Sequence, residues 1–216
     1  MSEVNLMDLY PKAKRDLEHR ATVSEENRRI AKMFSREFFD GTRDQGYGGY
    51  KYDGRWVPVV ARMRDHYRLA PNASILDVGC GKGFMLHDFK LAMPSCTVAG
   101  LDISAYAVEH AMEDVKPFLL VGNCRRLPYA DHSFDLVVSI NTVHNLKRDE
   151  CWQAIREIER VGRRHKFIVV DAYSNEQEKE RMLKWNLTAE TILHVDDWET
   201  LFTEAGYTGD YHWFTP

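Results

Sequence analysis

Short apolar runs alternate with helical patterns from Ser74 to the end of the chain. The runs fall at 75–78, 97–102, 118–121, 134–140, 166–170 and 207–214, and each has the length of a strand. Apolar residues recur at helical spacing at 84–93, 104–115, 150–161 and 197–205. Such alternation is typical of βαβ units. We therefore expect an α/β fold: a Rossmann-like, doubly wound, mostly parallel sheet of six or seven strands flanked by helices.

The first 70 residues show no clear strand. Apolar side chains recur at helical spacing from Ile30 to Phe38 and again over 56–69. Between these stretches, the glycine-rich segment 41–54 interrupts the pattern. We expect residues 1–70 to form an N-terminal helical cap or lid and residues 71–216 to form the Rossmann-like domain.

Composition narrows the function classes. The chain has 29 Lys and Arg against 33 Asp and Glu, so its net charge of -4 argues against a nucleic-acid partner. No apolar run is long enough to span a membrane, and the first 30 residues contain no apolar core typical of a signal peptide. The spacings of its four cysteines and nine histidines suggest neither disulfides nor a metal site. We expect a cytoplasmic protein with reduced thiols. Six early cations could form a patch for an acidic substrate, but acids alternate with them, which favours a solvated helical face: Lys12, Lys14, Arg15, Arg20, Arg28 and Arg29.

A glycine-rich turn follows the first strand of the predicted domain, as Asp77-Val-Gly79-Cys-Gly81-Lys-Gly83. The G-x-G-x-x-G pattern of nicotinamide and flavin sites needs its third glycine one position later, and the P-loop pattern also fails. An acid beside the turn suits a ligand with a cationic amino group rather than a pyrophosphate. Asp102, which closes the second strand, can accept hydrogen bonds from the hydroxyls of a ribose.

With these motifs the chain resembles the class I S-adenosylmethionine-dependent methyltransferases, in particular those that act on small molecules. The matching segments are ILDVGCGKGFML (75–86), LDIS (101–104), VGNCRRLPYADHSFDLVVSINTVHNL (121–146) and EAGY (204–207). The resemblance covers roughly residues 70–214. It implies S-adenosylmethionine as the cofactor and S-adenosylhomocysteine as the product.

The resemblance also implies which residues hold the cofactor. Three glycines would lie against its methionyl part: Gly79, Gly81 and Gly83. Asp77 would organise its amino group, and Asn141 would face the methionine moiety through its backbone. Asp102 would hold the ribose hydroxyls, and Ile103 would pack on the adenine.

Two more residues are implied on the adenine side. Asn123 stands where the family often has Asp, and its amide oxygen can still accept a hydrogen bond from the adenine amino group. Cys124 would offer its backbone N–H to the adenine ring.

Fewer residues are candidates for a role in methyl transfer or in contact with a ligand. His144 follows the fourth strand and could act as a general base, or it could be a half-buried loop histidine bonded to backbone. Tyr47 and Tyr50 lie in the glycine-rich segment, and Arg55 directly follows it. They could contact a ligand as part of a lid, although an ordinary surface loop would also fit.

We therefore expect a methyltransferase that acts on nitrogen or oxygen of a small polar metabolite, an amine or a sugar-like molecule. Alternatives are an RNA or protein methyltransferase, and a non-catalytic cofactor-binding partner subunit. The sequence identifies neither the acceptor nor its accepting atom. The family commonly ends in an antiparallel hairpin, for which this chain leaves little room. The sheet would then have six strands, or a second copy would complete its edge in a homodimer.

Overall fold

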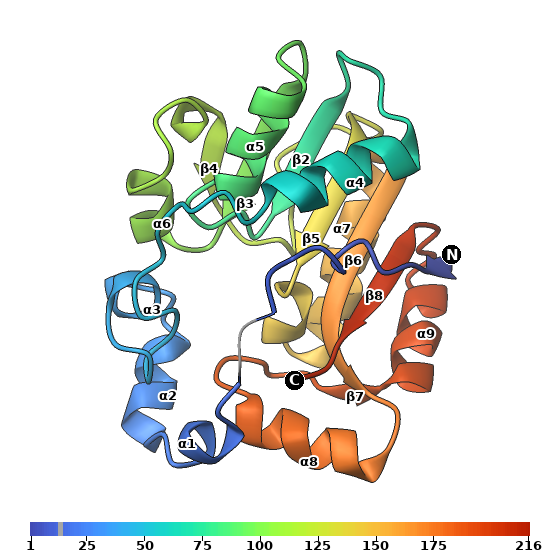
Figure 1. Cartoon of the computed structure of the whole chain (residues 1–216). Helices are drawn as coiled ribbons and strands as arrows, with labels where there is room; N and C mark the ends of the chain where they lie inside the picture. Colours follow the sequence, from blue (N-terminus) through green and yellow to red (C-terminus); the bar gives the residue numbers. More distant parts are fainter. Residues whose placement is uncertain (13–14) are drawn as a thin grey trace.

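One eight-stranded parallel sheet forms the centre of the computed structural model, which describes residues 1–12 and 15–216 (Figure 1). The strands are β1 (Ser2–Glu3), β2 (Ser74–Val78), β3 (Thr97–Asp102), β4 (Leu119–Val121), β5 (Phe134–Ile140), β6 (Gly162–Tyr173), β7 (Leu193–His194) and β8 (Asp210–Phe214). Their order is β1-β8-β6-β5-β2-β3-β4, and β7 pairs with β6 outside this path. All seven pairings between these described strands are parallel. The predicted fold class is confirmed, although the sheet has eight strands instead of the six or seven that we expected.

Helices cover both faces of the sheet. They are α1 (Leu17–Ala21), α2 (Glu25–Ala31), α3 (Arg36–Asp40), α4 (Val57–Tyr67), α5 (Phe84–Ala92), α6 (Ala105–Glu109), α7 (Arg148–Val161), α8 (Glu176–Trp185) and α9 (Val195–Glu204), with short 3-10 turns at Lys116–Phe118 and Val143–Asn145. Ile75 and Leu76, neighbours in β2, enter different hydrophobic clusters because side chains alternate across a strand. The first cluster includes Phe89 and residues of α4, and the second includes Ile155 and residues of α9. In the described part of the chain, no helix is both long and apolar enough to cross a membrane.

The sheet edge differs from the prediction. β8 lies directly beside β6, and β1 pairs with β8 in the register Ser2 to Asp210. The first residues of the same chain thus occupy part of the edge that we expected a second copy to complete. This removes the argument from which we expected a homodimer.

The N-terminal cap is more broken than its apolar spacing predicted. Phe34 takes a positive φ of 48° between α2 and α3, so the expected run from Ile30 to Phe38 is two helices. α4 packs into the sheet core, whereas α1, α2 and α3 stand to one side of the sheet (Figure 1). An ion pair of 3.0 Å between Glu18 and Lys184 joins α1 to α8. The division of the chain at residue 70 stays a prediction.

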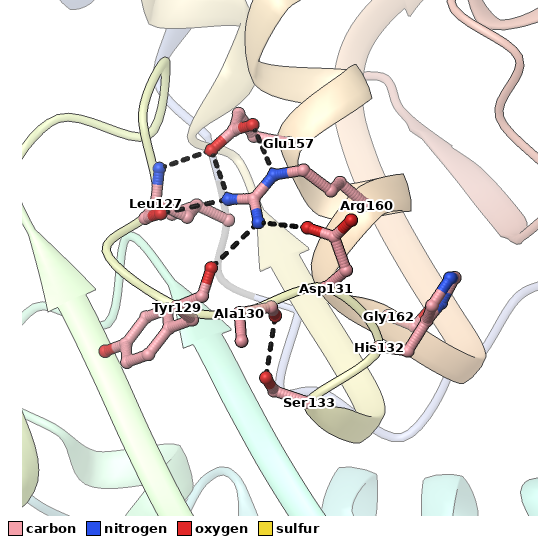
Figure 2. A network of polar contacts seen from close by, with 9 residues as sticks. All are labelled: Leu127, Tyr129, Ala130, Asp131, His132, Ser133, Glu157, Arg160 and Gly162. Atoms are coloured by element: carbon pink, nitrogen blue, oxygen red, sulfur yellow. Dashed lines mark hydrogen bonds and ion pairs between the residues drawn. The ribbon is translucent and has the colours of Figure 1, made fainter.

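Arg160 of α7 fixes the loop that leads from the predicted adenine side into β5 (Figure 2). Its guanidinium donates to the carbonyl oxygens of Leu127 and Tyr129, at 3.0 and 2.8 Å, and to the Asp131 carboxylate at 2.8 Å. Glu157 binds the same guanidinium at 2.7 Å and accepts from the Leu127 N–H. These bonds hold the loop in one conformation where it enters β5 at the amino end of the strand.

Candidate functional site

A cavity of about 710 Å³ lies at the carboxyl ends of β2, β3 and β5, where a doubly wound sheet binds ligands. All of the predicted site residues except Gly83 line it, together with residues of the N-terminal cap, the segment after α8 and β8. A smaller depression of about 470 Å³ lies beside Ser74 and Asp135, at the opposite ends of β2 and β5. It contains none of the predicted site residues, so the larger cavity is the candidate site.

The glycine turn bends tightly between β2 and α5. Gly79 has a φ of +87°, and its N–H donates to the Leu101 carbonyl at 2.7 Å. A Cβ on Gly79 would lie 1.9 Å from the Thr142 hydroxyl oxygen. Gly83, with a φ of +73°, begins α5, and a Cβ there would lie 2.7 Å from a methyl group of Val115. Both positions therefore require glycine.

Asp102 is held by backbone on both carboxylate oxygens. One oxygen accepts from the Ser104 N–H at 2.8 Å, and the other accepts from the Gly81 N–H at 2.7 Å. Each oxygen keeps a second lone pair for a ligand. Burial raises the pKa of Asp102, although these N–H bonds oppose the shift. The side chain is thus oriented in advance to accept two hydroxyls.

Asp77 is buried on the cavity wall, and its carboxyl group makes no hydrogen bond to any described residue. Burial, with a further contribution from the charge of Asp102, raises the pKa of Asp77 to about 8. A buried carboxyl group without a partner is costly to ionise. A ligand with a cationic group at this place would remove that cost.

The predicted adenine side contains one unusual side chain. Ile103 is 53% exposed although it is apolar, and it lines the cavity. A flat ring packed on it would remove this apolar surface from water. Together with the Asp102 carboxylate, the unpaired Asp77 and the turn at Gly79, this surface fits S-adenosylmethionine.

Asn123 and Cys124 fit the predicted contacts with adenine less simply. The side-chain oxygen of Asn123 accepts from the backbone N–H of Arg125 at 3.0 Å and from its Nε at 3.2 Å. The predicted bond from an adenine amino group therefore requires the Asn123 amide to turn. Cys124 lies on the cavity wall, and burial raises the pKa of its thiol to about 12, so it is an inert wall residue.

Asn141 and His144 follow β5. Asn141 has a positive φ of 53°, and its N–H donates to the Val169 carbonyl at 2.9 Å. His144 is buried, and its Nδ1 accepts from the Asp171 N–H at 2.8 Å. Burial lowers the pKa of His144, and the charge of Asp171 opposes this. The neutral ring thus carries its proton on Nε2 and offers a donor, which is unfavourable for the general base that we predicted.

The glycine-rich segment closes over the turn through a contact that the sequence did not reveal. The Lys82 ammonium donates to Asp40 at 2.6 Å and to the Tyr50 carbonyl at 3.0 Å. Asp40 also accepts from the Tyr50 N–H at 3.1 Å and from the Tyr106 hydroxyl at 2.7 Å. The rings of Tyr47 and Tyr50 stack with centroids 4.3 Å apart. We call the ion pair of Asp40 and Lys82 the lid latch. A lysine inside the glycine turn was the only signal for it.

Arg55 has partners of its own. It binds the Asp53 carboxylate at 2.8 and 2.6 Å and approaches the Tyr10 hydroxyl at 3.4 Å. These hydrogen bonds raise the pKa of the Arg55 guanidinium. The side chain lines the cavity, but in this arrangement it is paired within the cap. Within residues 1–12 and 15–216, no group of three or more His, Cys, Asp and Glu side chains is placed to hold a metal ion.

The far end of the cavity is basic, which corrects another expectation. Arg15 and Arg20 line the cavity, and Arg20 is only 6% exposed, so neither belongs to a solvated helical face. Lys14 lies outside the described residues. Arg43 and Trp185 complete this end, and sequence analysis assigned neither to a ligand site.

The fold and the cavity define a Rossmann-like protein with a site for a cationic nucleoside cofactor. A family described as "Methyltransferase domain" matches residues 76–170. Over this segment the chain is thus similar to the class I S-adenosylmethionine-dependent methyltransferases, as its motifs indicated.

Individual relatives are distant. Malonyl-[acyl-carrier protein] O-methyltransferase of Legionella pneumophila is 26% identical over 136 residues, which cover 61% of this chain and 46% of the relative. Sterol 24-C-methyltransferase ERG6B of Gibberella zeae is 27% identical over 155 residues, covering 64% and 40%. The chain thus spans less than half the length of these two relatives. Among solved structures, YcgJ of Bacillus subtilis superposes with a TM-score of 0.54 at 18% identity, covering 68% of this chain and 66% of that one, which shows the common fold.

Proposed function

We propose that the protein transfers a methyl group from S-adenosylmethionine to a small polar acceptor. The observation that carries the proposal is the single cavity in which the cofactor residues face the cap and the segment after α8. Cofactor and acceptor can therefore bind side by side, as an in-line displacement requires. The names of the two relatives refer to very different acceptors, a carrier-bound malonyl group and a sterol. The acceptor of this chain therefore has to be inferred from its own cavity.

Bound cofactor supplies an activated methyl group on a sulfonium. Asp102 holds the ribose hydroxyls, and Ile103 packs on the adenine. Asp77 pairs with the amino group and ionises as it does so. The turn at Gly79 lets the backbone approach closely, and Tyr50 closes the space above it.

His144 acts in this proposal as a positioning residue. Its Nε2–H donates a hydrogen bond to a polar group of the acceptor, while its Nδ1 stays bonded to the Asp171 N–H. The acceptor therefore attacks either without a base or after losing its proton to water. Its accepting atom is an oxygen or nitrogen with a free lone pair.

Location and assembly belong to the proposal as well. The four cysteines are free thiols, which is in keeping with a reducing, cytoplasmic environment. The proposal needs no second copy at the sheet edge, because β1 pairs there with β8.

Calorimetry with S-adenosylhomocysteine tests the cofactor site. We expect micromolar binding to the purified chain, and a loss of at least tenfold in Asp102→Asn because two hydroxyl contacts weaken. Asp65→Asn is the control, since that carboxylate lies on the exposed side of α4. Transfer is then measured by mass spectrometry with a panel of amines, sugars and carboxylic acids. Failure of the wild-type chain to bind S-adenosylhomocysteine would overturn the proposal.

The role of His144 is tested with two substitutions. In His144→Gln, the amide oxygen can accept from the Asp171 N–H and the amide nitrogen can donate, so turnover should stay within about tenfold of wild type. His144→Ala lacks both groups and should lose about a hundredfold. Both variants should bind S-adenosylhomocysteine normally. Equal loss in Ala and Gln, together with loss of an ionisation from the pH–rate profile, would instead identify a general base.

A further inference from the structure

Three arginines surround Trp185 at the end of the cavity away from the glycine turn. Their guanidinium carbons lie 5.8 Å (Arg15), 5.0 Å (Arg20) and 6.0 Å (Arg43) from the centre of its ring. We call these residues the arginine cluster. They come from the start of the cap, from α1 and from the loop after α3, while Trp185 ends α8. Arginines from the stretch around α1 and from the loop after α3 thus converge on the ring of Trp185.

The cluster has no acidic partner among the described residues, because none of its guanidiniums lies within 4.0 Å of a described carboxylate oxygen. All their hydrogen bonds go to backbone carbonyls: Arg15 to Thr215 at 3.5 Å, Arg20 to Arg43 at 3.2 Å, and Arg43 to Gly46 and Tyr47 at 3.3 Å. Four arginines of the described chain line the cavity, and of these Arg55 is paired with Asp53 whereas the three of the cluster have no acidic partner. An unpaired state inside the cavity therefore distinguishes the cluster.

Nearby charges do not explain this arrangement. Burial lowers the pKa of Arg15, Arg181 lowers it further, and Asp171 opposes both. Burial also lowers the pKa of Arg20; Arg43 and Arg28 act in the same direction, and the charge of Asp44 opposes them without reversing the shift. Burial and the neighbouring like charges both disfavour the charged form of these arginines. A bound anion would lower this energetic cost.

The position of the arginine cluster in the cavity indicates which ligand carries that anion. Asp171 lies between the two ends of the site, since its charge acts on Arg15 and its backbone N–H holds His144. A ligand group at the arginine cluster therefore lies on the acceptor side of His144. Guanidinium groups match the planar oxygens of carboxylates and the oxygens of phosphates, and several together form a strong site.

We infer that the arginine cluster binds an oxyanion of the methyl acceptor, so the acceptor is a small organic carboxylate or phosphate. The inference rests on the proposed function and specifies its substrate class. It replaces the amine and neutral sugar that we expected from the sequence. The aromatic rings of Phe214 and Trp185, over which Arg15 lies, hold that guanidinium in place.

Calorimetry with simple anions tests the cluster without knowledge of the natural acceptor. The probes are benzoate, inorganic phosphate and the neutral benzamide, each titrated into the full chain with and without saturating S-adenosylhomocysteine. We expect saturable millimolar binding of benzoate or phosphate and at least tenfold weaker binding of benzamide. Arg15→Gln and Arg43→Gln should each weaken anion binding by about tenfold. Arg29→Gln, on the exposed side of α2, should not.

The outcomes separate this inference from the proposed function. If benzoate and benzamide bind equally, or if the Arg15 and Arg43 variants keep full anion affinity, the inference is wrong. It is also wrong if these variants lose S-adenosylhomocysteine affinity and anion affinity stays unchanged, because the cluster would then hold the cofactor's own carboxylate. If the wild-type chain binds anions but no S-adenosylhomocysteine, the proposed function fails and the anion site stands. Thermal unfolding of each variant verifies that it is folded.

Discussion

The Asp77 carboxyl should make the unliganded protein less stable as pH rises. Its pKa is about 8 in the folded chain against an ordinary value of 3.8, because burial and the Asp102 charge disfavour ionisation. Between these two values the unfolded chain has lost the Asp77 proton and the folded chain has kept it. The contribution of Asp77 to stability is therefore greatest below pH 4 and falls until about pH 8, by about 1.4 kcal/mol per pH unit.

Asp77→Asn isolates this effect, because asparagine mimics the protonated carboxyl and does not titrate. The stability gain of the variant over wild type should grow by about 3 to 4 kcal/mol between pH 5 and pH 8. Urea unfolding at pH 5, 6.5 and 8 measures it. Asp65→Asn, in solvent on α4, should show no such growth. If Asp77→Asn and wild type lose stability with pH in parallel, the carboxyl is not buried as described.

Cofactor binding should show the opposite dependence on pH. The amino group of S-adenosylhomocysteine pairs with ionised Asp77, so binding below pH 8 first removes a proton. Affinity should then rise about tenfold from pH 6 to pH 7 in wild type and stay flat in Asp77→Asn. Calorimetry in two buffers of different ionisation enthalpy counts the released proton. Binding without proton release at pH 6.5 would refute the assignment of Asp77 to the amino group.

Two further predictions concern the turn and the lid. Gly79→Ala should abolish S-adenosylhomocysteine binding or unfold the chain, because its Cβ would clash with Thr142. Gly206→Ala, where φ is also positive but the space is open, should cost only about 1 to 2 kcal/mol of unfolding free energy. Lys82→Met should release the lid latch and leave Asp40 without a cationic partner. Limited proteolysis within residues 40–55 should then be faster than in wild type, and S-adenosylhomocysteine should slow it in wild type; equal rates in both proteins would exclude a latch.

The sheet and the cofactor residues could be predicted because their signals are local. Each strand is a short apolar run, and the turn after β2 needs glycine at fixed positions such as Gly79, which spacing alone reveals. Asp102 follows at the distance that one βαβ unit sets. The helix from Ile30 to Phe38 was wrong because periodicity does not register a single left-handed residue, Phe34, within an otherwise helical pattern.

The acceptor side could not be predicted, because it is made by contacts between distant segments. Arg15, Arg43 and Trp185 stand far apart in the sequence, and acids around Arg15 and Arg20 suggested a solvated face. The donor role of His144 likewise depends on a backbone N–H from β6, a strand that comes later in the chain. Residue type identified a candidate there, but only the fold shows which ring nitrogen is free.

The two ends of the cavity carry opposite charges, and this difference determines which ligand binds at which end. The acidic end, with Asp77 and Asp102, matches a cofactor that carries an ammonium and a sulfonium. The basic end, with Arg15 and Arg20, matches an acceptor that carries an anion. A cationic amine acceptor would be repelled by both the sulfonium and the arginines, at about 1 kcal/mol or more for each close pair. An anionic acceptor is attracted by both, and closing the lid over the glycine turn strengthens these attractions because it excludes water. The arginine cluster therefore selects the acceptor and also fixes its direction, with the oxyanion on Arg15 and the accepting atom beside His144.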